Sequence, residues 1–70
     1  MNLNVEALKK LMQEKYGGNY NAFARATGVN VALLYRIMTG QGNAGLKTIN
    51  ELVAFFKAND LKVEDYIFLP

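Results

Sequence analysis

The residue types in this chain exclude most catalytic chemistry. It contains no cysteine and no histidine, which removes disulfides, thiol nucleophiles, imidazole bases and the usual zinc ligands. Glu64 and Asp65 are adjacent carboxylates, but neighbouring residues on a helix do not face each other. We expect this pair to be a solvated helix start rather than an acid–base pair. We therefore predict that the chain is not an enzyme and has no metal site and no cofactor.

Arg36 offers the most specific chemistry. A guanidinium can donate two hydrogen bonds to O6 and N7 of a guanine, or it can be a solvated surface cation. If Leu34 and Ile37 face inward, a rotation of 100° per residue turns Ala32, Arg36 and Thr39 outward. Three larger side chains flank this outward face: Val31, Leu33 and Tyr35. Which interpretation of Arg36 applies depends on the elements that hold it.

The stretch from Asn19 to Gly40 predicts two short helices joined by a tight turn, over residues 20–27 and 31–39. Asn19 and Asn30 can cap these helices, because a short side-chain oxygen accepts from the free N–H groups of the first turn. Gly28 lies where the first helix must end and Gly40 where the second must end. A residue that closes a helix in the left-handed conformation is usually glycine.

This spacing resembles the helix-turn-helix of the phage Cro and repressor family, the xenobiotic-response-element-type regulators. The matching residues follow the family pattern of an apolar–Ala pair, a Gly-Val-Ser-like turn, two apolar residues three apart and a closing glycine. They are Phe23, Ala24, Gly28, Val29, Asn30, Leu34, Ile37 and Gly40. The match continues through Leu46, Ile49, Leu52 and Phe56, so it covers about the last three-quarters of the chain.

The resemblance implies an all-α, lambda-repressor-like domain of four to five short helices, with its motif core at Phe23, Ala24, Gly28, Leu34 and Ile37. The function that it implies is sequence-specific binding of double-stranded DNA by a transcriptional regulator, a repressor of phage or prophage type acting as a dimer. The second motif helix would lie in the major groove. The implied base contacts are Val31, Ala32, Leu33, Tyr35 and Arg36. The implied phosphate contacts are Asn19, Tyr20, Asn21, Asn30, Gln41, Asn43 and Lys47.

Two positions depart from the family pattern, and the outward face suggests an alternative function. Tyr20 stands where the family usually has a glutamine that touches phosphate, and Met38 stands where it often has glutamate. The face from Val31 to Tyr35 is also unusually apolar, and exposed apolar patches rimmed by polar groups mark interfaces. The alternative is therefore a protein-interaction module, such as an anti-repressor or an antitoxin.

Helices are also predicted on both sides of this stretch. We expect one over residues 5–16, capped by Asn4, and another over residues 46–59 after a glycine-rich loop at 40–45. The core stripe predicted for the second of these is Leu46, Ile49, Leu52, Val53 and Phe56, with Phe55 at its edge. A last short helix is predicted around residues 63–68. The last part of the chain has four consecutive apolar residues, Tyr66, Ile67, Phe68 and Leu69. We expect them partly to cover the first helix and partly to contact a second copy in a homodimer.

Length and charge limit the number of domains and the kinds of partner that this chain can have. Seventy residues predict a single domain over residues 1–70. The net charge of +2 is compatible with nucleic acid, although strong non-specific DNA binders are usually more basic. The chain begins without the pattern of a signal peptide, and its apolar runs are far below the roughly 18 residues that span a bilayer. We expect a cytoplasmic protein without membrane contact.

Overall fold

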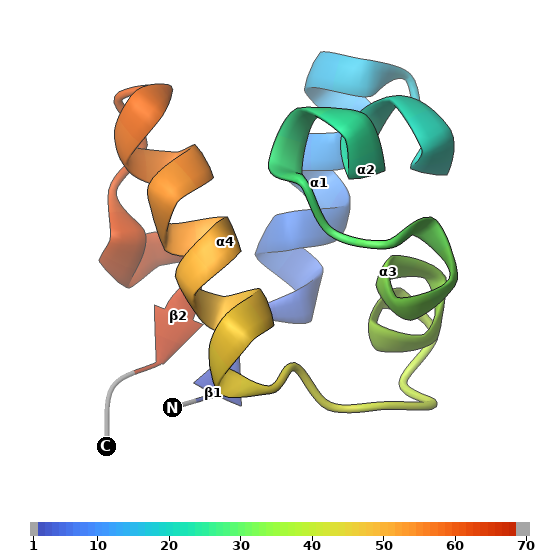
Figure 1. The fold of residues 1–70 in the computed structure, drawn as a ribbon. Helices are drawn as coiled ribbons and strands as arrows, with labels where there is room; N and C mark the ends of the chain where they lie inside the picture. The colour runs from blue at the N-terminus through green and yellow to red at the C-terminus, as the bar shows by residue number, and fades with distance from the viewer. Residues whose placement is uncertain (1, 69–70) are drawn as a thin grey trace.

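The computed structural model describes residues 2–68 as a mainly helical fold. Its elements in chain order are β1 (Asn2–Leu3), α1 (Val5–Tyr16), α2 (Tyr20–Thr27), α3 (Val31–Met38), α4 (Leu46–Ala58), the 3-10 helix η1 (Val63–Asp65) and β2 (Ile67–Phe68). In Figure 1, α2 and α3 lie to one side of α1, and α4 lies to its other side. The all-α expectation is confirmed apart from the two short strands.

Capping residues set the helix boundaries where the sequence predicts them. Asn4 accepts from the backbone N–H of Ala7 at 3.3 Å, and this satisfies one of the free donors at the start of α1. The bounds of α1 and α2 agree with the prediction residue for residue. The helices α3 and α4 each end one residue earlier than predicted, at Met38 and Ala58.

The core lies between α1, α2, α3 and α4 and contains a connected series of aromatic rings, which we call the aromatic chain. Its members are Tyr16, Phe23, Phe55, Phe56 and Tyr66. Successive ring centroids are 5.2, 5.7, 6.0 and 4.5 Å apart, within the usual range for favourable aromatic pairs. Phe23 and Phe56 are completely buried. These contacts tie the helices and the C-terminal segment into one core.

The buried face of α4 differs from the predicted stripe. Leu46 is 69% exposed, whereas Phe55 is only 8% exposed and belongs to the core. The buried residues of α4 are Thr48, Ile49, Leu52, Phe55 and Phe56. This set is as regular as the predicted one but is rotated around the helix axis, because Phe55 packs edge-on against Phe23. Placing Leu46 in the core and Phe55 at its edge was therefore wrong.

The C-terminal segment is a 3-10 turn and a strand, so the prediction of a last helix over residues 63–68 was wrong. β2 pairs antiparallel with β1, with Asn2 opposite Phe68 and Leu3 opposite Ile67. The N–H of Asn4 also donates to the carbonyl of Tyr66 at 2.7 Å. Figure 1 shows this small sheet bringing the two ends of the described chain together. The pairing partner is some sixty residues away, and local periodicity cannot show such a partner.

Two residues of the C-terminal apolar run, Tyr66 and Ile67, complete the molecule's own core. Ile67 is 1% exposed, and the half-buried Tyr66 stacks on Phe56 with ring centroids 4.5 Å apart. Phe68 is 55% exposed, and Leu69 lies outside the described residues. Tyr66 and Ile67 therefore pack within the chain, and in the described part of this C-terminal run only Phe68 exposes most of its side chain.

Candidate nucleic-acid interface

A three-residue turn fixes the relative orientation of α2 and α3. Gly28 adopts φ 81°, a left-handed conformation, and its N–H donates to the carbonyl of Ala24 at 2.8 Å. The buried hydroxyl of Thr27 donates to the carbonyl of Phe23 at 2.9 Å and accepts from the N–H of Val29 at 3.3 Å. Val29 is 3% exposed. Because the turn is both hydrogen-bonded and anchored in the core, α3 is held firmly against α2.

The helix α3 separates into a buried face and an exposed face. Leu34, Ile37 and Met38 are at most 3% exposed. Met38 therefore packs in the core, at the position where the Cro and repressor family often has a glutamate. The exposed side chains are Val31, Ala32, Tyr35, Arg36 and Thr39. Leu33 is half-buried and packs partly against the core. Among the residues predicted to touch bases, Leu33 is thus the one whose side chain is not exposed.

Tyr20 and Tyr35 form an aromatic contact that the sequence does not predict; we call it the tyrosine pair. Their ring centroids are 5.2 Å apart and their planes are inclined by 59°. Tyr20 begins α2 and is half-buried, whereas Tyr35 is 51% exposed. The contact joins the start of α2 to the middle of α3. One residue predicted to touch phosphate therefore lies beside one predicted to touch a base.

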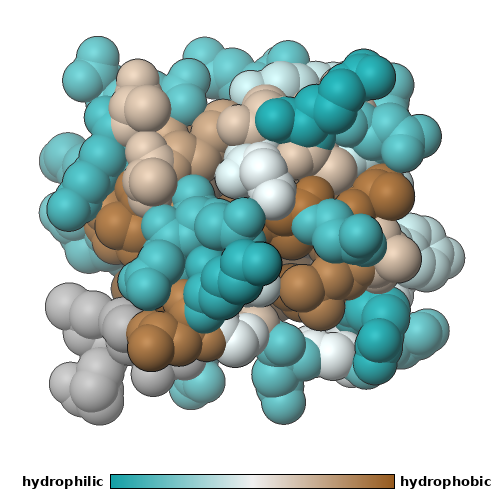
Figure 2. Space-filling model, in the orientation of Figure 1, coloured by the Kyte–Doolittle hydropathy of each residue, from teal (hydrophilic) through white to brown (hydrophobic). Residues whose placement is uncertain are grey.

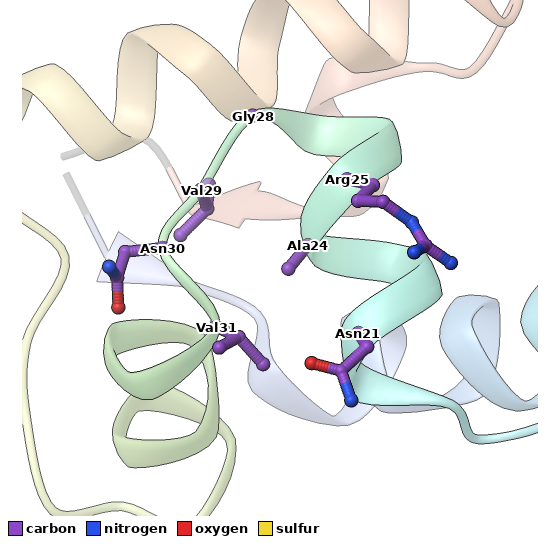
Figure 3. Close-up of a pocket in the computed structure, with 7 residues that line it drawn as sticks. All are labelled: Asn21, Ala24, Arg25, Gly28, Val29, Asn30 and Val31. Atoms are coloured by element: carbon purple, nitrogen blue, oxygen red, sulfur yellow. The ribbon is translucent and has the colours of Figure 1, made fainter.

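An open groove of about 630 Å³ separates the start of α3 from α2. In Figure 3 the side chains of Asn21 and Val31 point toward each other across it, Ala24 lies between the two helices, and Arg25 points away. Arg25 is exposed and did not figure among the predicted contacts. On the face drawn in Figure 2, apolar surface is divided into several areas separated by polar side chains.

The starts of α2, α3 and α4 hold most of the predicted phosphate contacts, and they differ in capping. The side-chain oxygen of Asn19 accepts from Ala22 N–H at 3.1 Å, and that of Asn30 accepts from Ala32 N–H at 2.9 Å. α4 starts at Gly45, which supplies no side-chain hydrogen bond. Its first N–H groups lack a capping side chain beside the exposed Lys47, and such groups favour an anion.

The loop between α3 and α4 runs close to Arg36. A Cβ atom built on Gly42 would lie 3.6 Å from Cβ of Arg36 and 3.9 Å from its Nε. The predicted phosphate-contacting residues Gln41 and Asn43 flank this glycine and are exposed. These are ordinary van der Waals distances, so the loop passes directly beside the side chain of Arg36.

Charge is distributed unevenly along the chain. No aspartate or glutamate occurs between Lys15 and Asn50, although the chain has six of them. The same segment contains four cations: Lys15, Arg25, Arg36 and Lys47. It includes α2, α3 and the start of α4. The overall charge of +2 is therefore distributed so that all charged residues of this segment are cations. This pattern could have identified Arg25 as a candidate DNA contact from the sequence.

Searches for a metal site and for a membrane span within residues 2–68, and comparisons with known proteins, gave no match. No three acidic, histidine or cysteine side chains in this part of the chain are grouped to hold a metal ion. None of its helices combines the length and the apolar character that crossing a membrane requires. No model of a protein family matches the sequence, and no curated protein and no solved structure matches the chain significantly.

Proposed function

We propose that this chain is a helix-turn-helix DNA-binding domain of the Cro and repressor type, with a lambda-repressor-like arrangement of its helices. The observation that carries the proposal is the exposed face of α3, which presents Arg36 within a segment that contains cations and no acids. DNA is a dense array of negative charge, so a segment that contains cations and no acids favours its approach. Glu51 of α4 is the acid nearest to the turn, with its Oε2 3.6 Å from a Cβ built on Gly28. The family pattern from Phe23 to Gly40 supports the same conclusion.

In the proposed complex, α3 lies in the major groove. Arg36 donates to O6 and N7 of a guanine, and Val31, Ala32 and Tyr35 lie against neighbouring base edges. The phosphates meet the rim, where backbone N–H groups and polar side chains fix the position of the domain without selecting a sequence. The rim residues are Asn19, Tyr20, Asn21, Arg25, Asn30, Gln41, Asn43 and Lys47.

The proposed regulatory action is repression by occupying a promoter. Two copies would bind two half-sites about one helical turn apart, because a symmetric dimer matches a palindromic operator. Since Tyr66 and Ile67 pack within the chain, the described part of the predicted dimer surface is reduced to Phe68.

Selection of bound sequences from a pool of duplexes at low salt tests this proposal. Recovery of a palindromic consensus supports it. Arg36→Ala removes one positive charge from α3. Its matched control, Lys10→Ala, removes one from the exposed side of α1. We expect only Arg36→Ala to relax the consensus. Weak binding without any consensus would reject sequence-specific recognition.

A protein-interaction module is the second candidate function, because Val31 and Tyr35 are 39% and 51% exposed. A half-exposed aromatic ring is a typical anchor of a protein interface. The two functions are distinguished by Tyr35→Ala and Arg36→Ala. If α3 binds a protein, Tyr35→Ala should weaken partner binding more than Arg36→Ala does, and the DNA affinity should be low for both variants. Leu33→Asp is less informative, because Leu33 also packs on the core.

A further inference from the structure

We infer that the DNA half-site recognised by this chain presents thymine methyl groups beside a single guanine. The inference rests on the proposed function and adds the class of sequence that is bound. It follows from which side chains on the exposed face of α3 can donate hydrogen bonds to a base and which cannot. Val31 and Ala32 have no polar side-chain atoms, and both are exposed at the start of the helix, the part that meets base edges in this mode of binding.

Hydrogen-bonding capacity on this face is confined to its later residues. The hydroxyl of Thr39 donates to the carbonyl of Tyr35 at 2.9 Å, so its proton is already used within the chain. The remaining side-chain donors are the guanidinium of Arg36 and the phenol of Tyr35. Arg36 alone has the paired donors that match guanine O6 and N7. The face therefore recognises one base pair by paired hydrogen bonds and the neighbouring ones by apolar contact.

Apolar contact in the major groove selects thymine. Among the four bases, only thymine presents a methyl group there, beside its O4 acceptor; the other bases present hydrogen-bonding atoms without a methyl group. Val31 or Ala32 placed against a cytosine amino group or a guanine O6 would leave that polar atom without a hydrogen bond. Contact with the methyl group thus favours thymine at the base pairs that Val31 and Ala32 face.

Charge identifies the occupant of this face as a nucleic acid, and the apolar residues identify it as DNA. The absence of acids from Lys15 to Asn50 complements phosphates along the whole segment. Duplex RNA has a deep, narrow major groove that side chains cannot enter, and its uracil lacks the methyl group. We therefore expect preference for a DNA duplex over an RNA duplex of the same sequence.

Deoxyuridine substitution tests this inference, because it removes one methyl group and retains every hydrogen-bonding group of the base. Each thymine of a selected duplex is replaced in turn, and affinity is measured by fluorescence anisotropy. Removal of a contacted methyl should weaken binding about three- to fourfold. Replacement of a thymine in the flanking sequence serves as the control and should change nothing.

A double-mutant cycle assigns the contact to a side chain. In Val31→Ala the deoxyuridine penalty at one thymine should largely disappear, whereas in Arg36→Ala it should persist while the guanine preference is lost. If a consensus is recovered and Arg36→Ala relaxes it, but no deoxyuridine changes the affinity, the thymine inference is wrong and the proposed function stands. If no consensus is recovered, both are wrong.

Discussion

The two groups of aromatic side chains in this small domain make similar ring contacts in opposite environments. In the aromatic chain, Phe56 is completely buried and stacks on Tyr66 at 4.5 Å. In the tyrosine pair, Tyr35 contacts Tyr20 at 5.2 Å but remains 51% exposed. Burial of apolar surface is the main favourable term in folding. The aromatic chain should therefore determine stability, whereas the tyrosine pair remains available for binding.

The largest expected effect is that of Phe56→Ala. Replacing a fully buried phenylalanine by alanine costs about 3–5 kcal/mol, and a domain of this size has a total stability of roughly 4–10 kcal/mol. Urea denaturation followed by circular dichroism should show a partly or wholly unfolded variant. Phe68→Ala is the matched control, since that ring is 55% exposed, and it should change stability by less than about 1 kcal/mol. Equal effects of the two substitutions would contradict the assignment of the core.

The turn between α2 and α3 gives the next largest expected effect on stability. Gly28→Val should lower the free energy of unfolding by about 1–3 kcal/mol, because a β-branched residue is strained at positive φ. The Cβ itself meets no crowding there, since the nearest heavy atom, Oε2 of Glu51, would lie 3.6 Å away. Gly45→Ala is the control at φ −75°. An unchanged melting temperature of Gly28→Val would mean that the turn does not constrain the fold.

On the exposed side, Arg36→Ala should have the largest effect on binding. We expect a loss of about 1–3 kcal/mol on the selected site together with relaxed preference at one base pair. Folding should be unaffected, because Arg36 is exposed. Anisotropy titrations against the selected duplex and a duplex with that base pair changed measure both quantities. A loss that is the same on the two duplexes would reassign Arg36 to phosphate contact.

The tyrosine pair should affect stability far less than the aromatic chain does. Tyr35→Ala should cost about 1 kcal/mol of folding free energy, the usual value of an aromatic pair, and should still reduce DNA affinity. Tyr35→Phe keeps the ring contact and serves as the control for folding. If Tyr35→Ala unfolds the domain as Phe56→Ala does, the contrast between the two aromatic groups does not hold.

Lys47→Ala should give the smallest effect. Lys47 lies in the first turn of α4 without a side-chain cap beside it, where a phosphate would offset its unfavourable interaction with the helix dipole. Its removal should weaken binding to all sequences alike and reduce the slope of log K against log salt by about 1. A change in sequence preference instead would indicate that Lys47 contacts a base.

Local sequence signals predicted the helical part of this fold well. The caps Asn4, Asn19 and Asn30 and the left-handed Gly28 act within one turn of their own positions, so the sequence alone is enough to place them. The buried residues Phe23, Leu34 and Ile37 follow from helical periodicity for the same reason. These features position α3 and its exposed face, which is the part of the candidate site that the sequence could predict.

Apart from Arg25, the features that the sequence missed depend on partners far along the chain. The pairing of β1 with β2 joins opposite ends of the chain, and the burial of Phe55 depends on the ring of Phe23. The contact of Tyr20 with Tyr35 depends on the angle between α2 and α3. Arg25 could have been recognised from the acid-free segment, because charge distribution needs no structure.

Amide chemical shifts of labelled protein, recorded during titration with the selected duplex, test the role of α3 most directly. We expect the largest changes at residues 30–36, smaller ones at the starts of α2 and α4, and almost none around Lys9, Lys10 and Tyr66. If the duplex saturates the protein while the amides of residues 30–36 do not shift, α3 does not recognise DNA.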